Sequence, residues 1–242
     1  MKYLKGSFRE MKTKEPGSAR YVFAGNFCFC LALLLSKLSK QLGRPTQSLA
    51  GWFITKTLVW HNGVLEENAV WLCGIRPDDT VLELGHGPGL GLVAAAPLLS
   101  GPKGKLIGVD YSDYMHQLAT KRVKELIACS KVTLHHGNVA AMPIPDNSVD
   151  KVYHCNCYYF WPDLREGSQE ILRVMKSGAV MVTTLRLQSL VYAASRGAIP
   201  PRNWHPDTYM EALQASRFTN VHMEEMTDRG INFQAIFATA YK

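Results

Sequence analysis

Residues 80–92, TVLELGHGPGLGL, constrain the fold of this chain more than any other stretch. Thr80–Leu84 is a short apolar run with the length and β-branched character of a buried parallel strand. A glycine-rich turn follows at Gly85, and an Ala- and Leu-rich segment up to Leu99 predicts a helix. This order places free backbone N–H groups and a positive helix end beside the strand's carboxyl end, where α/β folds bind nucleotide-like ligands.

The spacing of the glycines separates two classes of ligand. Gly85, Gly87 and Gly89 alternate, and the last glycine of the dinucleotide fingerprint G-x-G-x-x-G is replaced by Leu90. This departure disfavours a nicotinamide dinucleotide. Glu83 lies two residues before the first glycine, which gives the pattern E-x-G-x-G-x-G. The glycines let a ligand approach the backbone, because a Cβ atom would hold the two apart.

The positive charge of the chain is concentrated at one end. The chain has 242 residues and a net charge of +7, and residues 1–44 hold nine Lys/Arg against two acids. Residues 45–242 therefore carry 18 bases and 18 acids. A broad basic face for phosphate contacts is not expected there, so no nucleic-acid partner is predicted. The length suits one α/β domain with an appendage.

Residues 21–36, YVFAGNFCFCLALLLS, are uncharged and apolar, with positive charge on both sides. At sixteen residues the stretch is shorter than the roughly 20 residues that a membrane-spanning helix needs. Three interpretations stay open: a membrane-associated helix within residues 21–40, a mitochondrial-type leader, and a helix that covers the fold. Glu10 and Glu15 count against the leader. We therefore expect a cytoplasmic or membrane-associated protein, with a mitochondrial location as the alternative.

Gly43-Arg44-Pro45 marks the predicted boundary between a basic and apolar segment, 1–44, and a single domain, 45–242. Helical spacing of apolar residues returns from 49 to 73, and Asn62-Gly63 predicts a turn between two helices. Predicted strands cover residues 80–84, 105–110, 132–136, 151–155, 179–185, 219–226 and 231–241.

Asp110 ends the second predicted strand, about 20 residues beyond the glycine turn. An acid at that position can accept hydrogen bonds from both hydroxyls of a ribose. The alternative role is a cap for the helix that opens at Ser112 or Asp113, and the two roles are compatible.

No metal site is predicted. The six cysteines include two C-x-C pairs, Cys28/Cys30 and Cys155/Cys157, in apolar contexts without the C-x-x-C repeat of a zinc site.

Several motifs then occur in a fixed order: E-x-G-x-G-x-G, Asp110, Gly137-Asn138, PIPDNSVDKV at 143–152 and REGSQEILRVMKSGAVMVT at 165–183. Their order and spacing over roughly residues 42–190 resemble the class I S-adenosylmethionine (SAM)-dependent methyltransferases. The resemblance is strongest to the subfamily related to the ubiquinone/menaquinone-biosynthesis methyltransferases. This chain departs from the family pattern at His86, where an apolar residue is common, and at Asn138, where many relatives have Asp.

The resemblance implies an α/β, Rossmann-like, doubly wound fold with a mostly parallel seven-stranded sheet, an antiparallel last strand and N-terminal helices. It implies S-adenosyl-L-methionine as the cofactor. The implied binding residues are Glu83, Gly85, His86, Gly87, Gly89, Asp110, Tyr111, Asn138, Val139 and Asn156. Among them, Glu83 and the glycines shape the methionine side, Asp110 holds ribose and Asn138 holds adenine.

Asn156 and Tyr159 are the implied catalytic residues, because they follow the fourth strand where the methyl group would lie. Tyr158, Tyr159, Phe160 and Trp161 offer aromatic faces to a sulfonium or to a flat apolar substrate. Core packing is the alternative for Tyr158 and Phe160. For an oxygen nucleophile, the proton acceptors to consider are His154, His86 and His205.

The predicted function is methyl transfer from SAM to a small-molecule or lipid-like acceptor by in-line displacement. Residues 188–207, which are irregular and rich in proline, are expected to cover the site as a substrate-choosing loop. The alternative is a non-catalytic SAM-binding regulatory or interaction protein on the same fold, which His86 and Asn138 leave open.

Overall fold

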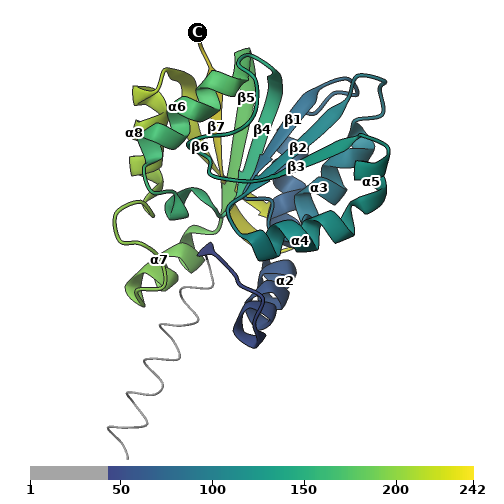
Figure 1. The fold of residues 1–242 in the computed structure, drawn as a ribbon. Helices are drawn as coiled ribbons and strands as arrows, with labels where there is room; N and C mark the ends of the chain where they lie inside the picture. Colours follow the sequence, from purple (N-terminus) through teal and green to yellow (C-terminus); the bar gives the residue numbers. More distant parts are fainter. Residues whose placement is uncertain (1–42) are drawn as a thin grey trace, which may run out of the picture. The chain divides into compact units, whose positions relative to one another are not determined.

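A computed structural model describes residues 43–242, so the apolar stretch 21–36 and nearly all of the predicted segment 1–44 lie outside the described residues. In the described part, seven strands form one sheet in the order β3-β2-β1-β4-β5-β7-β6 (Figure 1). The strands are β1 (Thr80–Leu84), β2 (Lys105–Asp110), β3 (Val132–His136), β4 (Val149–Cys155), β5 (Met175–Leu185), β6 (Phe218–Asp228) and β7 (Ile231–Ala240).

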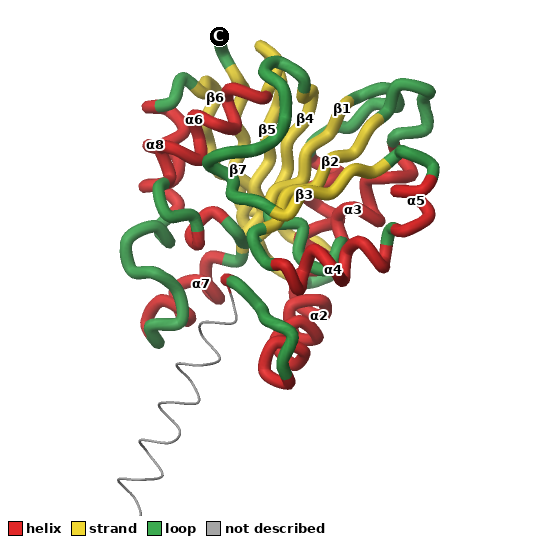
Figure 2. The backbone as a smooth tube through the Cα atoms, viewed as in Figure 1, coloured by secondary structure: helices red, strands yellow, loops and turns green. Residues whose placement is uncertain are grey.

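The pairing of the strands confirms the predicted fold. Strands β3, β2, β1, β4 and β5 run parallel to one another, and β7 runs antiparallel to both β5 and β6. The strand order reverses at β1, with β2 and β3 on one side and β4 and β5 on the other. The loops after these strands lie at one end of the sheet (Figure 2), and the crevice at such a reversal is where open α/β sheets bind ligands.

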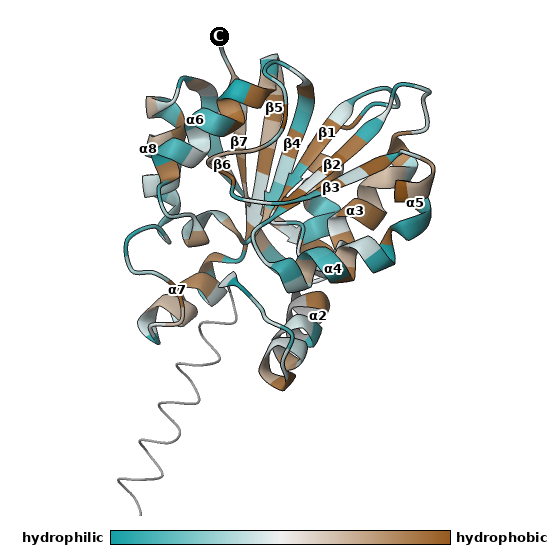
Figure 3. Ribbon diagram, viewed as in Figure 1, coloured by the Kyte–Doolittle hydropathy of each residue, from teal (hydrophilic) through white to brown (hydrophobic). Residues whose placement is uncertain are grey.

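Helices cover both faces of the sheet, and the strands are rich in apolar residues (Figure 3). Adjacent residues of β1 point to opposite faces. Val81 belongs to an apolar cluster with Ala69, and Leu82 to a second cluster with Ile171. The helices are α2 (Leu49–Leu72), α3 (Leu90–Ala95), α4 (Asp113–Arg122), α5 (Lys124–Ala128), α6 (Leu164–Val174), α7 (Leu187–Ser195) and α8 (Pro206–Ala215), with short 3-10 turns η1 (Ala96–Leu98) and η2 (Tyr158–Phe160).

Helix α2 is continuous, so the predicted turn at Asn62-Gly63 is wrong. Ser48 caps the helix, because its Oγ accepts the N–H of Gly51 at 3.0 Å. A glycine in a helix interior costs roughly 0.5–1 kcal/mol relative to alanine. Burial of Leu65 and Ala69, both 0% exposed, outweighs that cost by packing the helix against α3, β4 and β5.

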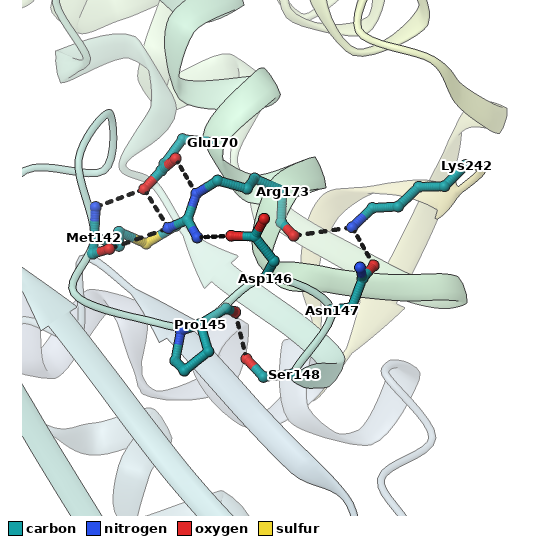
Figure 4. Close-up of polar contacts among 8 residues, drawn as sticks. All are labelled: Met142, Pro145, Asp146, Asn147, Ser148, Glu170, Arg173 and Lys242. Atoms are coloured by element: carbon teal, nitrogen blue, oxygen red, sulfur yellow. Dashed lines mark hydrogen bonds and ion pairs between the residues drawn. The ribbon is translucent and has the colours of Figure 1, made fainter.

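A loop connects β3 to β4 over residues 137–148, and an ion-pair network holds it to α6 (Figure 4). The Arg173 guanidinium bridges the carboxylates of Glu170 and Asp146 and donates to the Met142 carbonyl at 3.1 Å. Hydrogen bonding between Arg173 and Glu170 raises the pKa of the guanidinium and lowers the pKa of the carboxyl. The network thereby fixes the path of the chain that leaves β3.

Candidate active site

A pocket of about 370 Å³ opens at the carboxyl edge of the parallel strands. Its walls come from the ends of β1, β2 and β4, from the loop after β3, and from helices α2 and α7. Gly43 and Pro45 line it as well, although the predicted domain boundary falls between them. Segments that are far apart in the sequence therefore meet around one cavity.

The glycine turn after β1 has positive φ angles of +62° at Gly85, +51° at Gly87 and +85° at Gly89. Close packing excludes side chains at two of these positions. A Cβ atom at Gly85 would lie 2.8 Å from Cys157 Cβ, and one at Gly89 would lie 3.3 Å from Ala119 Cβ. The sequence therefore needs glycine here for the local fold as well as for access to the backbone.

The N–H groups of these glycines make hydrogen bonds within the protein, which corrects the expectation that they are free. Gly85 donates to the carbonyl of Val109 at 2.7 Å, and Gly89 donates to the carbonyl of His86 at 2.9 Å. The donors thus stabilise the turn itself, and the turn offers a ligand its open backbone surface.

Asp110 lines the pocket with a carboxylate that is held at both oxygens. Oδ2 accepts the N–H of Gly87 at 2.8 Å, and Oδ1 accepts the N–H of Ser112 at 2.7 Å. Each oxygen keeps a further lone pair for a ligand hydroxyl. The cap of α4 is Ser112, whose Oγ accepts the N–H of Met115 at 3.3 Å.

Tyr111, Asn138 and Val139, three of the predicted binding residues, line the pocket together with Asp110, and they lie just after the neighbouring strands β2 and β3. The Oδ1 of Asn138 accepts the N–H of Ala140 at 3.1 Å, which holds the amide in a local turn. The Tyr111 ring is exposed on one side and contacts the Arg44 guanidinium, whose Cζ lies 4.5 Å from the ring centroid.

Asn156 follows β4 with a φ of +49°, a conformation that Asn adopts more readily than most residues. Its N–H donates to the Thr184 carbonyl at 3.0 Å, and its Nδ2 donates to Asn62 Oδ1 of α2 at 3.2 Å. Asn156 and Tyr159, the two predicted catalytic residues, both line the pocket.

The aromatic residues after Asn156 divide between the pocket and the core. Tyr159, Phe160 and Trp161 line the pocket. Tyr158 is fully buried and stacks on Tyr209 of α8, with ring centroids 4.3 Å apart. Tyr158 therefore packs in the core, whereas Phe160 forms part of the pocket wall.

Two buried carboxyl groups lie at the α2 side of the site. Glu83 does not line the pocket; it is 1% exposed, and its Oε2 accepts the hydroxyl of Tyr153 at 2.9 Å. Glu66 of α2 does line it and was not predicted from the sequence. Burial raises the pKa of both carboxyl groups, that of Glu66 to about 8.

The three histidines considered as proton acceptors are absent from the lining of this pocket. His86 is buried beside the glycine turn, and burial lowers its pKa. His154 is fully buried, with Nε2 2.8 Å from Thr183 Oγ1 and 2.9 Å from the Tyr209 hydroxyl, and burial lowers its pKa to about 3. His205 lies exposed at the start of α8.

Comparisons with known proteins bear on this arrangement. Residues 81–178 match a family described as "Methyltransferase domain". The uncharacterized methyltransferase YdaC of Bacillus subtilis is 32% identical over 126 residues, which are 52% of this chain and 66% of that protein. A demethylmenaquinone methyltransferase of Lactiplantibacillus plantarum is 36% identical over 102 residues, which are 42% of this chain and 43% of that protein. This chain thus spans less than two thirds of the length of these curated relatives.

A solved structure shares the fold. Geranyl diphosphate C-methyltransferase from Streptomyces coelicolor A3(2), crystallised with Mg²⁺, geranyl diphosphate and S-adenosyl-L-homocysteine, aligns with a TM-score of 0.60. The alignment covers 83% of this chain and 87% of that chain at 19% sequence identity. At that identity the likeness establishes the architecture alone.

Proposed function

We propose that the chain, whose residues 81–178 match a methyltransferase domain, is a class I SAM-dependent methyltransferase that transfers a methyl group from SAM to a small-molecule or lipid-like acceptor by in-line displacement. One observation carries this proposal. Asp110 at the end of β2 and the pair Asn156 and Tyr159 after β4 line a single pocket at the point where the strand order reverses.

The pocket is suited to the adenosine half of SAM on its β2–β3 side. Asp110 would accept the ribose hydroxyls, because both of its oxygens are already positioned by backbone N–H groups. Asn138 would bond the adenine edge, and Val139 and Tyr111 would contact the faces of the ring. All four residues line the pocket and follow or end the neighbouring strands β2 and β3, which supports this placement.

The methionine half would lie on the β1–β4 side, along Gly85, Gly87 and the α2 residues. Gly89, Glu83 and His86, predicted as binding residues, do not line the pocket. They would act by positioning the turn, since Gly89 starts α3 and accommodates Ala119. SAM supplies, when bound, the electrophilic methyl group of its sulfonium.

For such a displacement, the protein would contribute in two ways: it would position the reacting atoms, and it would exclude water from them. Holding the reacting atoms in line is a type of effect worth about 7–11 kcal/mol at most. Asn156 is fixed by its bonds to Asn62 and Thr184 and would border the methyl group. Tyr159, with Phe160 beside it, would face the sulfonium and keep water out.

We infer a lipid-like acceptor, such as a quinone with an apolar tail, from the apolar side of the pocket. Leu190 and Ala193 of α7 and Ile199 after it line this side, so the predicted covering loop is in part a helix. The resemblance to demethylmenaquinone methyltransferases supports the same class of acceptor.

A membrane surface would be the source of such an acceptor. Leu49 and Trp52 of α2 and Tyr192 of α7 are apolar or aromatic side chains that are more than half exposed. Within residues 43–242 no helix has both the length and the apolar character to cross a membrane. These exposed side chains would contact the membrane surface from outside it, as in a peripheral protein.

The non-catalytic SAM-binding protein remains the second candidate. The observation that favours it is the absence of His86, His154 and His205 from the pocket lining, which removes the predicted bases for an oxygen nucleophile.

Two experiments in sequence test these proposals. A thermal-shift titration should show stabilisation by SAM and by S-adenosylhomocysteine but not by NADH; stabilisation by NADH alone would contradict the assignment. The protein is then incubated with methyl-labelled SAM and a total lipid extract. Label in the organic phase supports the transferase, and SAM binding without any transfer to lipid or aqueous acceptors supports the non-catalytic alternative.

A further inference from the structure

Glu66 and Glu83 converge on one buried point between α2, β1 and α3. A Cβ atom at Gly91 of α3 would lie 2.4 Å from Glu83 Oε1 and 3.0 Å from Glu66 Oε2. Both oxygens are buried, and no donor group among the described residues reaches either of them. The glycine leaves the space that the two carboxyl groups occupy. A proton held between them is the donor that these oxygens lack.

The surroundings of this carboxyl pair are acidic or neutral. Tyr153 and Cys155 face it from β4, Asp110 faces it from β2, and α3 contributes no ionisable side chain. Burial is the main cause that raises the pKa of Glu66 to about 8, and Asp110 raises it further. Burial and the charge of Glu66 likewise raise the pKa of Glu83. The pair therefore holds at least one proton at neutral pH.

Only one member of the pair is open to a ligand. Glu66 lines the pocket, at 7% exposed, one helical turn after Asn62, whose side chain accepts a hydrogen bond from Asn156 after β4. In the described residues, the charged side chains that line the pocket are Glu66, Asp110 and Arg186. Asp110 belongs to the β2 side, so Glu66 is the carboxyl group nearest the proposed methionine half.

We propose that Glu66, sharing a proton with Glu83, is the counter-charge for the positively charged methionine end of SAM, and that SAM binding releases this proton to solvent. The inference rests on the proposed function and adds a residue and a proton step to it. A cation placed beside the pair favours the ionised carboxylate, and the proton leaves as the cation arrives. No other bond forms or breaks.

Isothermal titration calorimetry of SAM into the wild-type protein tests the proton step. Titrations at pH 7 in phosphate and in Tris, whose ionisation enthalpies differ, give the number of protons released. We expect release of up to one proton with SAM and none with 5′-methylthioadenosine, which lacks both positive charges. SAM affinity should rise with pH by up to about tenfold per unit below pH 8. A titration with S-adenosylhomocysteine shows which of the two charges causes the proton release, because this ligand keeps the ammonium and lacks the sulfonium.

The variant Glu66→Gln should abolish the proton release and weaken SAM binding by about tenfold to a hundredfold. Its affinity for 5′-methylthioadenosine should not change. Glu67→Gln is the matched control, because Glu67 is the next residue of α2 and faces solvent in an ion pair with Arg229. This control should release the proton as the wild type does.

The proposed function and the role of Glu66 fail on different results. If wild-type protein does not bind SAM, the proposed function and the role of Glu66 are both overturned. If it binds SAM without releasing a proton, or if Glu66→Gln still releases one, only the role of Glu66 is overturned. The wild-type titrations decide whether the proton step occurs even if the variant does not fold.

Discussion

The Gly87 N–H donates to Asp110 Oδ2 at 2.8 Å and so ties the turn after β1 to the end of β2. The other carboxylate oxygen accepts the Ser112 N–H at 2.7 Å, at the cap of α4. One side chain thus joins three elements of the pocket while facing the proposed ribose. Asp110 consequently has a structural role that does not depend on a ligand.

We expect Asp110→Asn to weaken SAM binding at least tenfold and to lower the free energy of unfolding by about 1–3 kcal/mol. The amide keeps one acceptor oxygen but loses the charge, so one of the two backbone N–H groups loses its partner. Calorimetry and urea unfolding measure the two effects. Asp113→Asn, on the exposed first turn of α4, is the control. Unchanged SAM affinity in Asp110→Asn would show that the ribose assignment is wrong.

Substitution of Tyr159 should change ligand affinity, whereas substitution of its neighbour Tyr158 should change the stability of the fold. Tyr159→Leu removes the aromatic face from the pocket wall and should lower affinity for SAM relative to S-adenosylhomocysteine by about 0.5–2 kcal/mol, because only SAM has the sulfonium charge. Tyr158→Phe removes a hydroxyl that donates to the Trp204 carbonyl at 2.9 Å. Tyr158→Phe should lower the free energy of unfolding by about 1 kcal/mol without changing the affinity for SAM relative to S-adenosylhomocysteine. An equal loss of affinity for both ligands in Tyr159→Leu would place the sulfonium elsewhere.

His154 should make the fold sensitive to acid. Its pKa of about 3 in the folded protein lies below the ordinary value of 6.5 because the ring is buried. Below pH 6.5 the unfolded chain binds a proton there that the folded chain does not, so stability falls with falling pH. Between pH 6.5 and 5 the wild type should lose about 2 kcal/mol more than His154→Gln. His205→Gln, at an exposed position, should follow the wild type in the same urea titrations.

Gly63→Ala should raise the free energy of unfolding by roughly 0.5–1 kcal/mol, because Gly63 lies inside α2 and the added methyl group lowers the entropy of the unfolded chain. A Cβ atom there would meet nothing within 4 Å, so no clash offsets the gain. SAM affinity should stay unchanged. A loss of stability would indicate that α2 is interrupted at this position after all.

The sheet could be predicted from the sequence because short apolar runs, glycine turns and helical segments alternate. Residues 80–84, 105–110 and 132–136 have the same bounds as β1, β2 and β3. The α2 region was harder, since Asn62-Gly63 has the composition of a turn. Burial of one face of α2 overrides that local preference. This packing involves residues distant in the sequence, so the amino acids around Asn62-Gly63 do not reveal it.

The polar pocket residues at the ends of strands could be predicted from the sequence, whereas the polar pocket residues of α2 could not. Asp110 ends a predicted strand and Asn138 and Asn156 each follow one, so their meeting at one edge could be expected. Asn62 and Glu66 are four residues apart and share a helix face only if the helix is continuous. Glu83 fits the motif by spacing and His86 lies within it, but both side chains are buried and neither lines the pocket.

Ser112 gives the chain's N-terminal side a direct mechanical link to the nucleoside end of the pocket. Its Oγ donates to the Pro45 carbonyl at 2.6 Å, while its backbone N–H anchors Asp110. A change in the position of Pro45 would therefore be transmitted through Ser112 to Asp110, the acid proposed to bind the ribose.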